Sequence, residues 1–357
     1  KEMIRAGSCR GIGSTCYDRQ QERPRFFAGV ESWERVLVNE FSLIDRYFSR
    51  PCARADVALS VGDDAAVLLP PPGERLVVSC DTSIAGRHFL ADADPRDVGY
   101  KVLAVNLSDL AAMGATARWV TLALSLPEID TDWLEGFAEG FYTLAEQSSV
   151  CLVGGDTTRG DLSITVTAMG TAPPEAILRR DGARPGDLVA VTGTLGDAGM
   201  GLSIATGQLT PAGPAVDAFA RTRMNRPTPR LAEGQILRGV ATSAIDISDG
   251  LAADLGHLLE RSGTGARVYL ADLPISDAMR QQFGPTEKWR DRQWALPVSA
   301  GDDYELLFTL PPAAVEPLRA HLAFQVIGAI TEASGLTLLR HDMQPLTLER
   351  AGHDHFA

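Results

Sequence analysis

The sequence predicts an α/β protein with two domains, on the basis of three observations. Its 357 residues are enough for two domains of ordinary size. From residue 40 onwards, strand-like apolar runs alternate with segments of helical periodicity. The stretch "APPEAILRRDGARPGD" is rich in proline, glycine and charge, and it indicates a domain junction near residues 172–186. We therefore expect an N-terminal domain over residues 37–172 and a C-terminal domain over residues 173–357.

Residues 1–36 differ from the rest of the chain. They lack apolar periodicity, and the first residue is not methionine. We expect this leader to be vector-derived, an upstream extension or disordered, and we assign it no part in the fold.

The N-terminal domain is expected to hold four strands and two helices. The segment "ERLVVSCDT" (74–82) is typical of a buried strand, with Asp81 where the strand ends. Residues 94–115 have helical spacing, with Asp94 as cap and Pro95 in the first turn. The other segments are a strand at 119–126, a helix at 132–147 and strands at 150–158 and 162–170.

The C-terminal domain continues the alternation without a short-period repeat. A strand at 187–193 is followed by a helix from about residue 197, a polar proline-rich stretch and a helix near 229–239. The remaining expected elements are a strand at 243–248, a helix at 250–263 and strands at 266–270, 304–310 and 324–330.

Charge and hydropathy narrow the classes of partner. The formal net charge of −13 argues against unassisted binding of nucleic acid or of an anionic membrane. Solubility alone also accounts for such a charge. No apolar stretch reaches the roughly 20 residues that span a bilayer, and the longest candidate is interrupted by Asp109 and Arg118. No "GxxxxGK" segment is present, which excludes a P-loop enzyme.

The five cysteines, at positions 9, 16, 52, 80 and 151, show no CxxC pair and no zinc-type spacing. Their odd number, without a signal peptide, predicts reduced thiols. We therefore expect the protein in the cytoplasm.

A carboxylate on the apolar stripe of the helix at 94–115 is the sharpest local signal. Val98, Val102 and Val105 recur at helical spacing, and Asp109 falls on the same stripe. A buried carboxylate is costly unless it is paired, hydrogen-bonded or bound to a cation. For Asp109 taken alone, a bond to a neighbouring backbone group or arginine is the simpler explanation.

Further aspartates follow predicted strands, where the ligand sites of α/β sheets gather. Asp81 and Asp156 each follow such a strand. Asp246 ends another, and Asp249 comes next at the start of a helix. Each alone is usually a turn or helix cap. If they converge, their repulsion requires several divalent cations, and hard oxygen ligands favour Mg²⁺.

The segment "AIDISDGLAADLG" adds a candidate phosphate-binding element. Ser248 is predicted to cap the helix and Asp249 to be its first residue, so that free backbone N–H groups point outward. "LVGGDTT" offers two glycines that allow close approach of the backbone to a ligand. The glycine pair is a weak signal by itself.

Seven motifs occur in order: "EFSLIDRYF", "GDDAAVL", "DTSIAGRHF", "KVLAVNLSDLAAMGA", "LVGGDTTRG", "AIDISDGLAADLG" and "GDDYELLFT". Together they closely resemble the bacterial thiamine-monophosphate kinase family, within the aminoimidazole-ribonucleotide-synthetase-like ATP-binding superfamily. The resemblance runs from about residue 39 to the C-terminal "GHDHF". It implies an N-terminal α/β domain that dimerises to complete a barrel, followed by a C-terminal α/β domain. It also implies ATP-dependent phosphorylation of thiamine monophosphate to thiamine diphosphate, with several Mg²⁺ ions.

The resemblance also assigns residues to the site. Asp109, Asp81 and Asp246 are implied as catalytic, and Asp109 is expected to bridge several ions. The implied metal ligands are Asp64, Ser79, Cys80, Asp81, Asp109, Asp156, Asp246 and Asp249. The implied ATP-binding residues are Gly155, Asp156, Arg180 and Ser248. The implied substrate-binding residues are His88, Asp302 and His353.

Three positions depart from the family pattern and affect the expected thiamine pocket. Cys80 stands where threonine is usual, so its backbone carbonyl would be the ligand, because a thiol binds Mg²⁺ poorly. Asp302 replaces a longer glutamate, and His353 replaces an aromatic ring. Asp63, beside Asp64, is expected to orient the turn or to bond locally.

Two alternatives stand beside the kinase: another ATP-dependent synthetase of the superfamily, and a non-catalytic nucleotide-binding protein. "GDDYELLF" and "DTSIAGRHF" favour the kinase, and the filled acidic positions argue against a degenerate site. For the kinase we expect direct in-line transfer in a homodimer. The acceptor phosphate oxygen is already ionised, so no strong general base is required.

Overall fold

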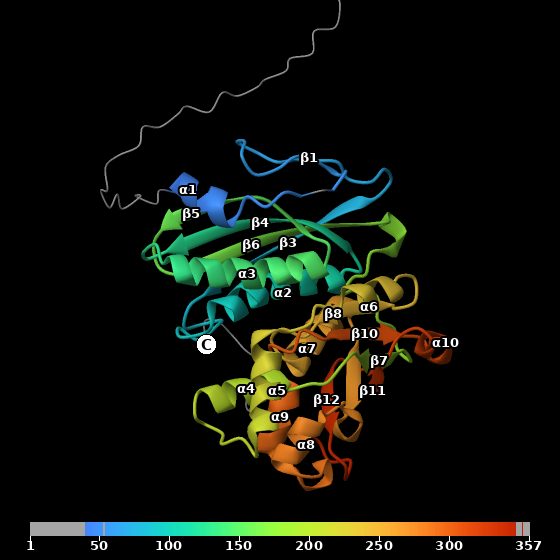
Figure 1. The fold of residues 1–357 in the computed structure, drawn as a ribbon. Helices are drawn as coiled ribbons and strands as arrows, with labels where there is room; N and C mark the ends of the chain where they lie inside the picture. Colours follow the sequence, from blue (N-terminus) through green and yellow to red (C-terminus); the bar gives the residue numbers. More distant parts are fainter. Residues whose placement is uncertain (1–39, 53, 348–351, 353–357) are drawn as a thin grey trace, which may run out of the picture. The chain divides into compact units, whose positions relative to one another are not determined.

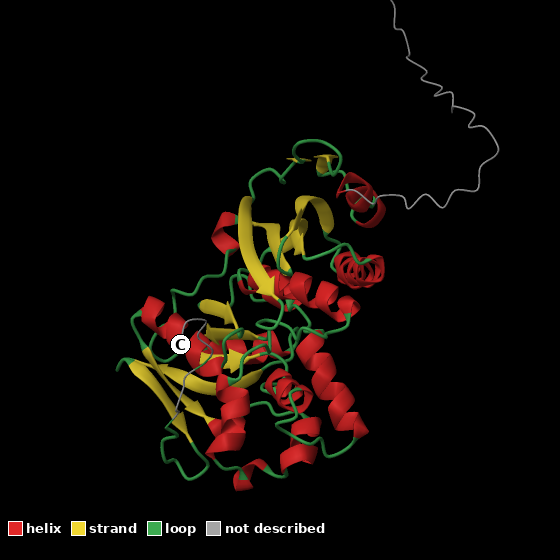
Figure 2. Cartoon of the chain, turned by 90° about the vertical axis from the view of Figure 1, so that its left-hand side faces the viewer, coloured by secondary structure: helices red, strands yellow, loops and turns green. Residues whose placement is uncertain are grey.

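A computed structural model describes residues 40–52, 54–347 and 352 of the chain. They form two α/β domains, each built on its own sheet with helices packed against it (Figures 1 and 2). The predicted leader, residues 1–36, and His353 lie outside the described residues.

The first domain comprises, in chain order, α1 (Glu40–Tyr47), β1 (Val57–Leu59), β2 (Val67–Leu68), β3 (Arg75–Ile84), α2 (Pro95–Ala112), β4 (Thr116–Leu126), α3 (Thr131–Gln147), β5 (Cys151–Arg159) and β6 (Ser163–Ala172). The second comprises β7 (Leu188–Val191), α4 (Asp197–Ala205), α5 (Pro214–Asn225), α6 (Leu231–Ile236), β8 (Ser243–Asp246), α7 (Leu251–Ser262), β9 (Gly265–Tyr269), α8 (Asp277–Phe283), α9 (Asp291–Ser299), β10 (Leu306–Leu310), α10 (Val315–Arg319), β11 (Gln325–Thr331) and β12 (Gly335–Leu339).

A four-stranded sheet, in the order β3-β6-β4-β5, lies at the centre of the N-terminal domain. Strand β6 is antiparallel to both neighbours, whereas β4 and β5 are parallel and are joined by α3. Helices α2 and α3 lie along one face of this sheet (Figure 1). Buried side chains such as Leu103, Phe137 and Val166 fill the space between the layers.

Helix α2 forms as the sequence predicts. The Asp94 carboxylate caps it by accepting the Arg96 N–H at 2.8 Å, and Pro95 is its first residue. Val98, Val102 and Val105 are all buried. The predicted stripe therefore faces the protein interior, and it carries the half-buried Asp109 with it.

Two glycines let α2 and α3 pack with their backbones in contact. A β-carbon at Gly140 would lie 1.8 Å from the Arg96 carbonyl oxygen, and one at Gly99 would lie 2.0 Å from that of Phe137. Any side chain at these two positions would push the helices apart, and α2 would shift with them.

One face of β3 is uncovered in the described chain. Leu76, Val78 and Ile84 are 51%, 54% and 42% exposed. They alternate with residues that point towards α2, as the period of a strand requires. Strand β3 is also an edge of its sheet, and β5 is the other edge.

The C-terminal domain is built on a six-stranded sheet in the order β12-β9-β11-β7-β10-β8. Its pairs are antiparallel apart from β12 with β9. Helices α4, α5, α7, α8 and α9 bury one core with this sheet, including Met200, Leu255 and Trp294. On the other face, Phe308 belongs to a cluster that includes Ala111 and Ala112 of α2. Helix α2 therefore contributes to the core of both domains.

Several elements differ from the sequence prediction. The stretch expected to be polar and proline-rich contains α5, because Pro214 occupies the first turn, where proline is tolerated. Strand β12 and helices α8 and α9 were not predicted. Asp81 and Asp156 were expected at strand ends, yet β3 and β5 each continue for three residues beyond them.

The expectation of reduced thiols is wrong for two of the cysteines. Cys52 and Cys151 form a disulfide that joins positions 99 residues apart. The spacing gave no sign of this pair, because the fold alone brings the segment after α1 beside the start of β5. Cys80 is free and exposed. Among the described residues, no helix is long and apolar enough to cross a membrane.

Candidate active site

A hydroxyl and two carboxylates meet where β3 crosses α2. Ser79 and Asp81 are two residues apart on β3 and point to the same face. The Ser79 hydroxyl donates to the Asp109 carboxylate of α2. The Asn106 side-chain oxygen accepts the Asp81 backbone N–H at 3.0 Å. The strand and the helix are thus held in a register that aligns the polar groups of β3 with the last two turns of α2.

The C-terminal domain adds a third carboxylate. Asp246 is the last residue of β8, as predicted, and it is 3% exposed. Its carboxylate accepts a 2.7 Å hydrogen bond from the Ser108 hydroxyl of α2. Adjacent residues of one helix, Ser108 and Asp109, therefore contact polar groups of both domains.

Burial and mutual repulsion disfavour negative charge on these acids. Burial, followed by the charge of Asp109, raises the pKa of Asp81 to about 6. The same two causes, in the same order, raise the pKa of Asp246 to about 7, while Ser108 and Arg180 oppose the change. A cation placed among these groups would remove the repulsion.

A cavity of about 510 Å³ opens beside these acids. Ser79 and Asp109 line it on one side, and Arg179, Arg180 and Arg261 line it on another. Arg180 was predicted to bind ATP, and Arg261 is an addition that the sequence did not reveal. A basic residue in the last turn of α7 is usual for any helix. Guanidinium groups around a cavity suit phosphate oxygens.

Asp64, Gly155 and Asp156 lie together, but they line a different cavity, of about 710 Å³. The Asp63 carboxylate accepts the Asp64 N–H at 2.9 Å, which confirms the local role predicted for Asp63. Gly155 has a positive φ, and a β-carbon there would lie 1.8 Å from the carbonyl oxygen of Leu122. The pairing of β5 with β4 therefore requires glycine at position 155, whether or not this residue also binds a ligand.

The sheet register separates the two cavities. Asp81 pairs with Val166, Val166 with Leu122, and Leu122 with Gly155. Three strand spacings amount to about 14 Å. Within one chain, Asp156 thus lies across the sheet from the acids around Asp109.

The predicted phosphate-binding turn differs from the expectation. Helix α7 begins at Leu251, with Gly250 as its N-cap, so neither Ser248 nor Asp249 is helical. The N–H groups of residues 248–250 all donate to one Asp254 carboxylate oxygen, at 3.0, 3.0 and 3.1 Å. Because Asp254 already accepts from these three N–H groups, they are not free to bind a phosphate. Burial, and then Asp246 and Asp249, raise the pKa of Asp254 to about 8.

Two of the three predicted substrate-binding residues are described. The His88 ring accepts the Ile84 N–H at 3.0 Å in the turn after β3. The Asp302 carboxylate forms a 2.8 Å ion pair with Lys101 of α2. Neither residue lines the cavity beside Asp109.

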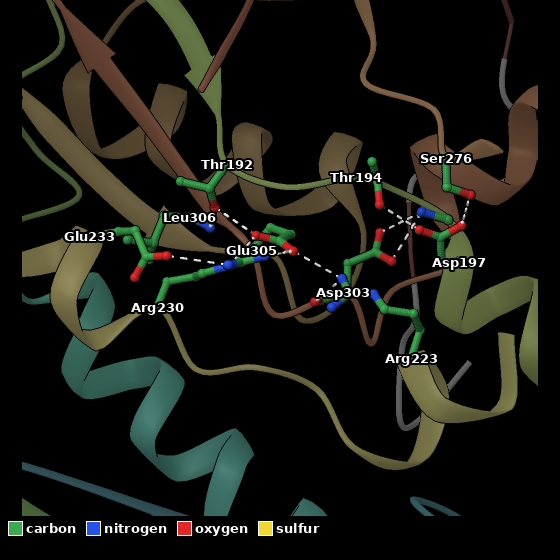
Figure 3. A network of polar contacts seen from close by, with 11 residues as sticks. Thr192, Thr194, Asp197, Arg223, Arg230, Glu233, Ser276, Asp303, Glu305 and Leu306 are labelled. Carbon is green, nitrogen blue, oxygen red and sulfur yellow. Dashed lines mark hydrogen bonds and ion pairs between the residues drawn. The ribbon is translucent and has the colours of Figure 1, made fainter. Parts of the chain in front are cut away.

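A buried ionic network holds the strand that follows Asp302 (Figure 3). Glu305 is fully buried, and both its carboxylate oxygens accept from Arg230 at 2.6 Å. Arg223 and Thr192 add bonds of 2.9 and 2.7 Å. This network was not predicted from the sequence, although Glu305 lies within the motif "GDDYELLF". Its partners come from separate parts of the chain.

Oxygen donors of this kind suit Mg²⁺, which uses one or two carboxylates together with water and substrate phosphates. In the described part of the chain, no group of three or more His, Cys, Asp or Glu side chains is placed to hold a metal ion. The pair Asp81 and Asp109, with Asp246 nearby, is therefore the arrangement that fits a magnesium ion shared with phosphates. The Cys80 thiol accepts from Thr167 at 3.4 Å on the face of β3 away from Asp109.

Comparison with known proteins agrees with this architecture. The family model for AIR synthase related protein, N-terminal domain, matches residues 62–172, and that for its C-terminal domain matches residues 184–340. The two domains and their acidic site thus define a protein of the AIR synthase related class.

Individual relatives are more specific. Thiamine-monophosphate kinase of Escherichia coli (strain K12) is 48% identical over 329 residues, which cover 90% of this chain and 99% of that protein. The crystal structure of thiamine-monophosphate kinase from Stenotrophomonas maltophilia K279a has a TM-score of 0.76 at 46% identity, covering 83% of this chain and 95% of that one. AaThiL complexed with AMPPCP and TMP has a TM-score of 0.70 at 31% identity, covering 89% and 97%. The chain belongs to the thiamine-monophosphate kinase family.

Proposed function

We propose that this protein transfers the γ-phosphoryl group of ATP to thiamine monophosphate, giving thiamine diphosphate. The observation that carries the proposal is the contact of Asp81 with Asp109, with Asp246 nearby, at a cavity that Asp109 and three arginines line. Family membership supplies the substrates, because the relative AaThiL is complexed with AMPPCP and TMP.

The acids have a definite task in this proposal. Asp81, Asp109 and Asp246 hold Mg²⁺ ions that neutralise charge on the two phosphate groups. The further ligands that we propose are Asp64, Ser79, the Cys80 carbonyl, Asp156 and Asp249. Arg180, Gly155, Asp156 and Ser248 bind ATP, and His88, Asp302 and His353 bind thiamine monophosphate.

Transfer is proposed to be direct and in line. The attacking atom is a phosphate oxygen of the acceptor, which is ionised near neutral pH and needs no strong base. Positioning and charge neutralisation are then the main tasks of the chain. The arginines around the cavity hold the donor phosphates, and the acids hold the metal.

A homodimer would unite the two halves of the site. The open edges of the four-stranded sheet are β3 and β5. A two-fold axis along a closed barrel pairs β3 of each subunit with β5 of its partner. This closure would place β5 of one subunit, which carries Asp156, next to β3 of the other, which carries Asp81. It also covers Leu76 and Val78, which are exposed in the single chain.

One assay tests the activity. Thiamine diphosphate should form from ATP and thiamine monophosphate with Mg²⁺, and thiamine should be a poor acceptor. A chiral γ-phosphate should emerge with inverted configuration. Net retention would contradict direct transfer, and no product would contradict the proposed reaction itself. Location in the cytoplasm stays a prediction.

Asp109→Asn should reduce turnover by about three orders of magnitude or more, because it removes a charge that several ions share. Its melting temperature should stay close to that of the wild type. The matched control is Asp272→Asn, an exposed acid of the other domain, which should keep full activity. An Asp109→Asn protein of normal activity would contradict the metal-binding role.

Mixed dimers test the composite site. Asp109→Asn and Asp156→Asn subunits are each expected to be inactive as homodimers. In a heterodimer of the two, one site would carry both substitutions and the other would be intact. About half of the wild-type turnover should return. A heterodimer without activity would mean that each site lies within a single chain.

A further inference from the structure

An ion pair between a buried lysine and a partly exposed aspartate joins the two domains next to the acidic site. Lys101 of α2 is 9% exposed at its side chain, and its ammonium nitrogen lies 2.8 Å from a carboxylate oxygen of Asp302. The described chain holds one other lysine, Lys288, which is exposed. Lysine is seldom buried, because its ammonium group loses water at a high cost.

The position of the Asp302 carboxylate is fixed by an uncommon backbone conformation and by several hydrogen bonds. Asp302 and Tyr304 have φ angles of 62° and 50°, a region that is unfavourable for residues other than glycine. Backbone bonds of 2.8 Å to Ser248 and Ile247 hold both residues there. The Tyr304 hydroxyl donates to the second oxygen of Asp302 at 3.0 Å. Strain of this kind is retained where a side chain must point in one direction.

The pair lies at one end of the acidic site. Lys101 and Ser108 are seven residues apart, on the same face of α2 and about 10 Å apart along its axis. Each contacts a carboxylate of the C-terminal domain, Lys101 that of Asp302 and Ser108 that of Asp246. Asp302 itself is 37% exposed at its side chain, so the pair is open to a ligand from that side.

We propose that Lys101 binds the phosphate of thiamine monophosphate, and that Asp302 occupies its ammonium group until the substrate arrives. This inference rests on the proposed function and assigns a substrate-binding residue that the sequence did not suggest. The acceptor carries an anionic phosphate and a cationic thiazolium ring. When the phosphate takes Lys101, the Asp302 carboxylate becomes free to face the cation.

An exchange of this kind keeps the buried Lys101 and its Asp302 partner both paired throughout. Removing one partner of a buried ion pair is costly, because the other charge is left without compensation. A zwitterionic ligand replaces both partners at once, because its phosphate pairs with Lys101 and its cation pairs with Asp302. The cost of removing Lys101 from water is therefore not incurred a second time on binding. A ligand with the phosphate alone would have to displace Asp302 without supplying a cation in place of Lys101. The pair thus favours a phosphate ester that carries a positive charge.

Kinetics distinguish substrate binding from a merely structural bridge. Lys101→Met should raise the KM for thiamine monophosphate about 10- to 100-fold, as expected for a lost charged hydrogen bond. The KM for ATP should change less than about threefold, and Lys288→Met should alter neither value. A Lys101→Met enzyme with an unchanged KM for thiamine monophosphate would overturn the proposal. If the wild type itself forms no thiamine diphosphate, the proposed reaction fails instead.

Methyl phosphate has no cationic ring, so substitution of Asp302 should change its affinity in the opposite direction from the affinity for thiamine monophosphate. Asp302→Asn removes the competing carboxylate, so methyl phosphate should bind more tightly than to the wild type, by about tenfold. The same variant should bind thiamine monophosphate more weakly. The double variant Lys101→Met with Asp302→Asn leaves no unpaired buried charge and should fold, yet it should lose the methyl phosphate site. Equal binding of methyl phosphate to the single and double variants would overturn the proposal.

Discussion

Asp109 lies half-buried between the Ser79 hydroxyl of β3 and the carboxylates of Asp81 and Asp246. The other members of its stripe on α2 are the buried side chains of Val98, Val102 and Val105. A carboxylate retained there at such a cost is more consistent with cation binding than with stability. Asp81 and Asp246 are also held where negative charge is disfavoured, because the charge of Asp109 raises the pKa of each.

The acids predict a pH dependence of stability with a definite sign. The pKa values of Asp81 (about 6) and Asp246 (about 7) lie above the value of about 3.9 for an unfolded aspartate. Between these values the folded protein binds more protons than the unfolded chain. The contribution of these groups to stability is therefore present below about pH 4 and is lost as the pH rises to about 7.

Thermal melts in EDTA should show this loss between about pH 4 and 7, and Asp246→Asn should show less of it. Mg²⁺ should stabilise the wild type more at pH 8 than at pH 5, since it competes with protons for the same oxygens. Asp272→Asn is the control and should follow the wild type. Parallel pH profiles of the wild type and Asp246→Asn in EDTA would contradict the assignment.

Sequence alone indicates individual residues only when the local pattern carries the information. The helical stripe identified Asp109, and the adjacent acid identified the local role of Asp63. The capture of the 248–250 N–H groups by Asp254 was missed, since Asp254 has the spacing of an ordinary helix residue. The Lys101 pair was missed because its partner lies 201 positions away. Contacts between domains leave no local trace.

Helix α2 positions most of the site, and its own position depends on α3. The two helices touch through the backbone at Gly99 and Gly140, and α2 in turn meets β3 and β8. A change in the spacing of the helices would therefore move Ser108 and Asp109 together.

Gly140→Ala should lower the free energy of unfolding by about 1–3 kcal/mol, because the new methyl group meets the Arg96 backbone rather than a flexible side chain. Gly256→Ala is a matched control inside α7, where nothing lies within 4 Å of the new carbon. That substitution should raise stability by about 0.5–1 kcal/mol. Urea unfolding of both variants decides the matter. A stabilised Gly140→Ala protein would contradict the close packing.

Most elements were predictable because their apolar spacing is regular. Helix α2 and strands β3 to β6 fall close to the predicted segments. Helix α5 is not apparent in the sequence, because a proline-rich stretch is typical of a loop, whereas Pro214 here begins the helix. Strand ends near Asp81 and Asp156 were placed too early. Polar residues within a strand resemble a turn when the partner strands are unknown.

Across the whole molecule, the disulfide is the feature that the sequence least suggested. It closes a loop of 99 positions, from the segment after α1 to the first residue of β5. The segment that carries Asp64 lies within this loop, and β5 carries Asp156. The bond joins the segment after α1 to β5, and Ser49 and Leu152, which lie near its two cysteines, also line the second cavity.

Reduction should lower the free energy of unfolding by about 2–4 kcal/mol, because the unfolded chain regains the freedom of a long loop. Urea titrations with and without dithiothreitol measure the difference, and mass spectrometry of unreduced peptides identifies the bond. The double variant Cys52→Ser, Cys151→Ser should not respond to the reductant. A wild-type midpoint that is unchanged by dithiothreitol would mean that the bond is absent.

The Asp254 carboxylate, which takes all three N–H groups of residues 248–250, has a consequence for the speed of binding. A turn whose N–H groups are satisfied only by a bound anion must become ordered each time the ligand binds. This conformational ordering slows association. Here the ordering is completed once, when the chain folds. Nucleotide arrival should therefore be limited by diffusion and electrostatics rather than by rearrangement of this turn, at whatever nucleotide concentration the cell maintains.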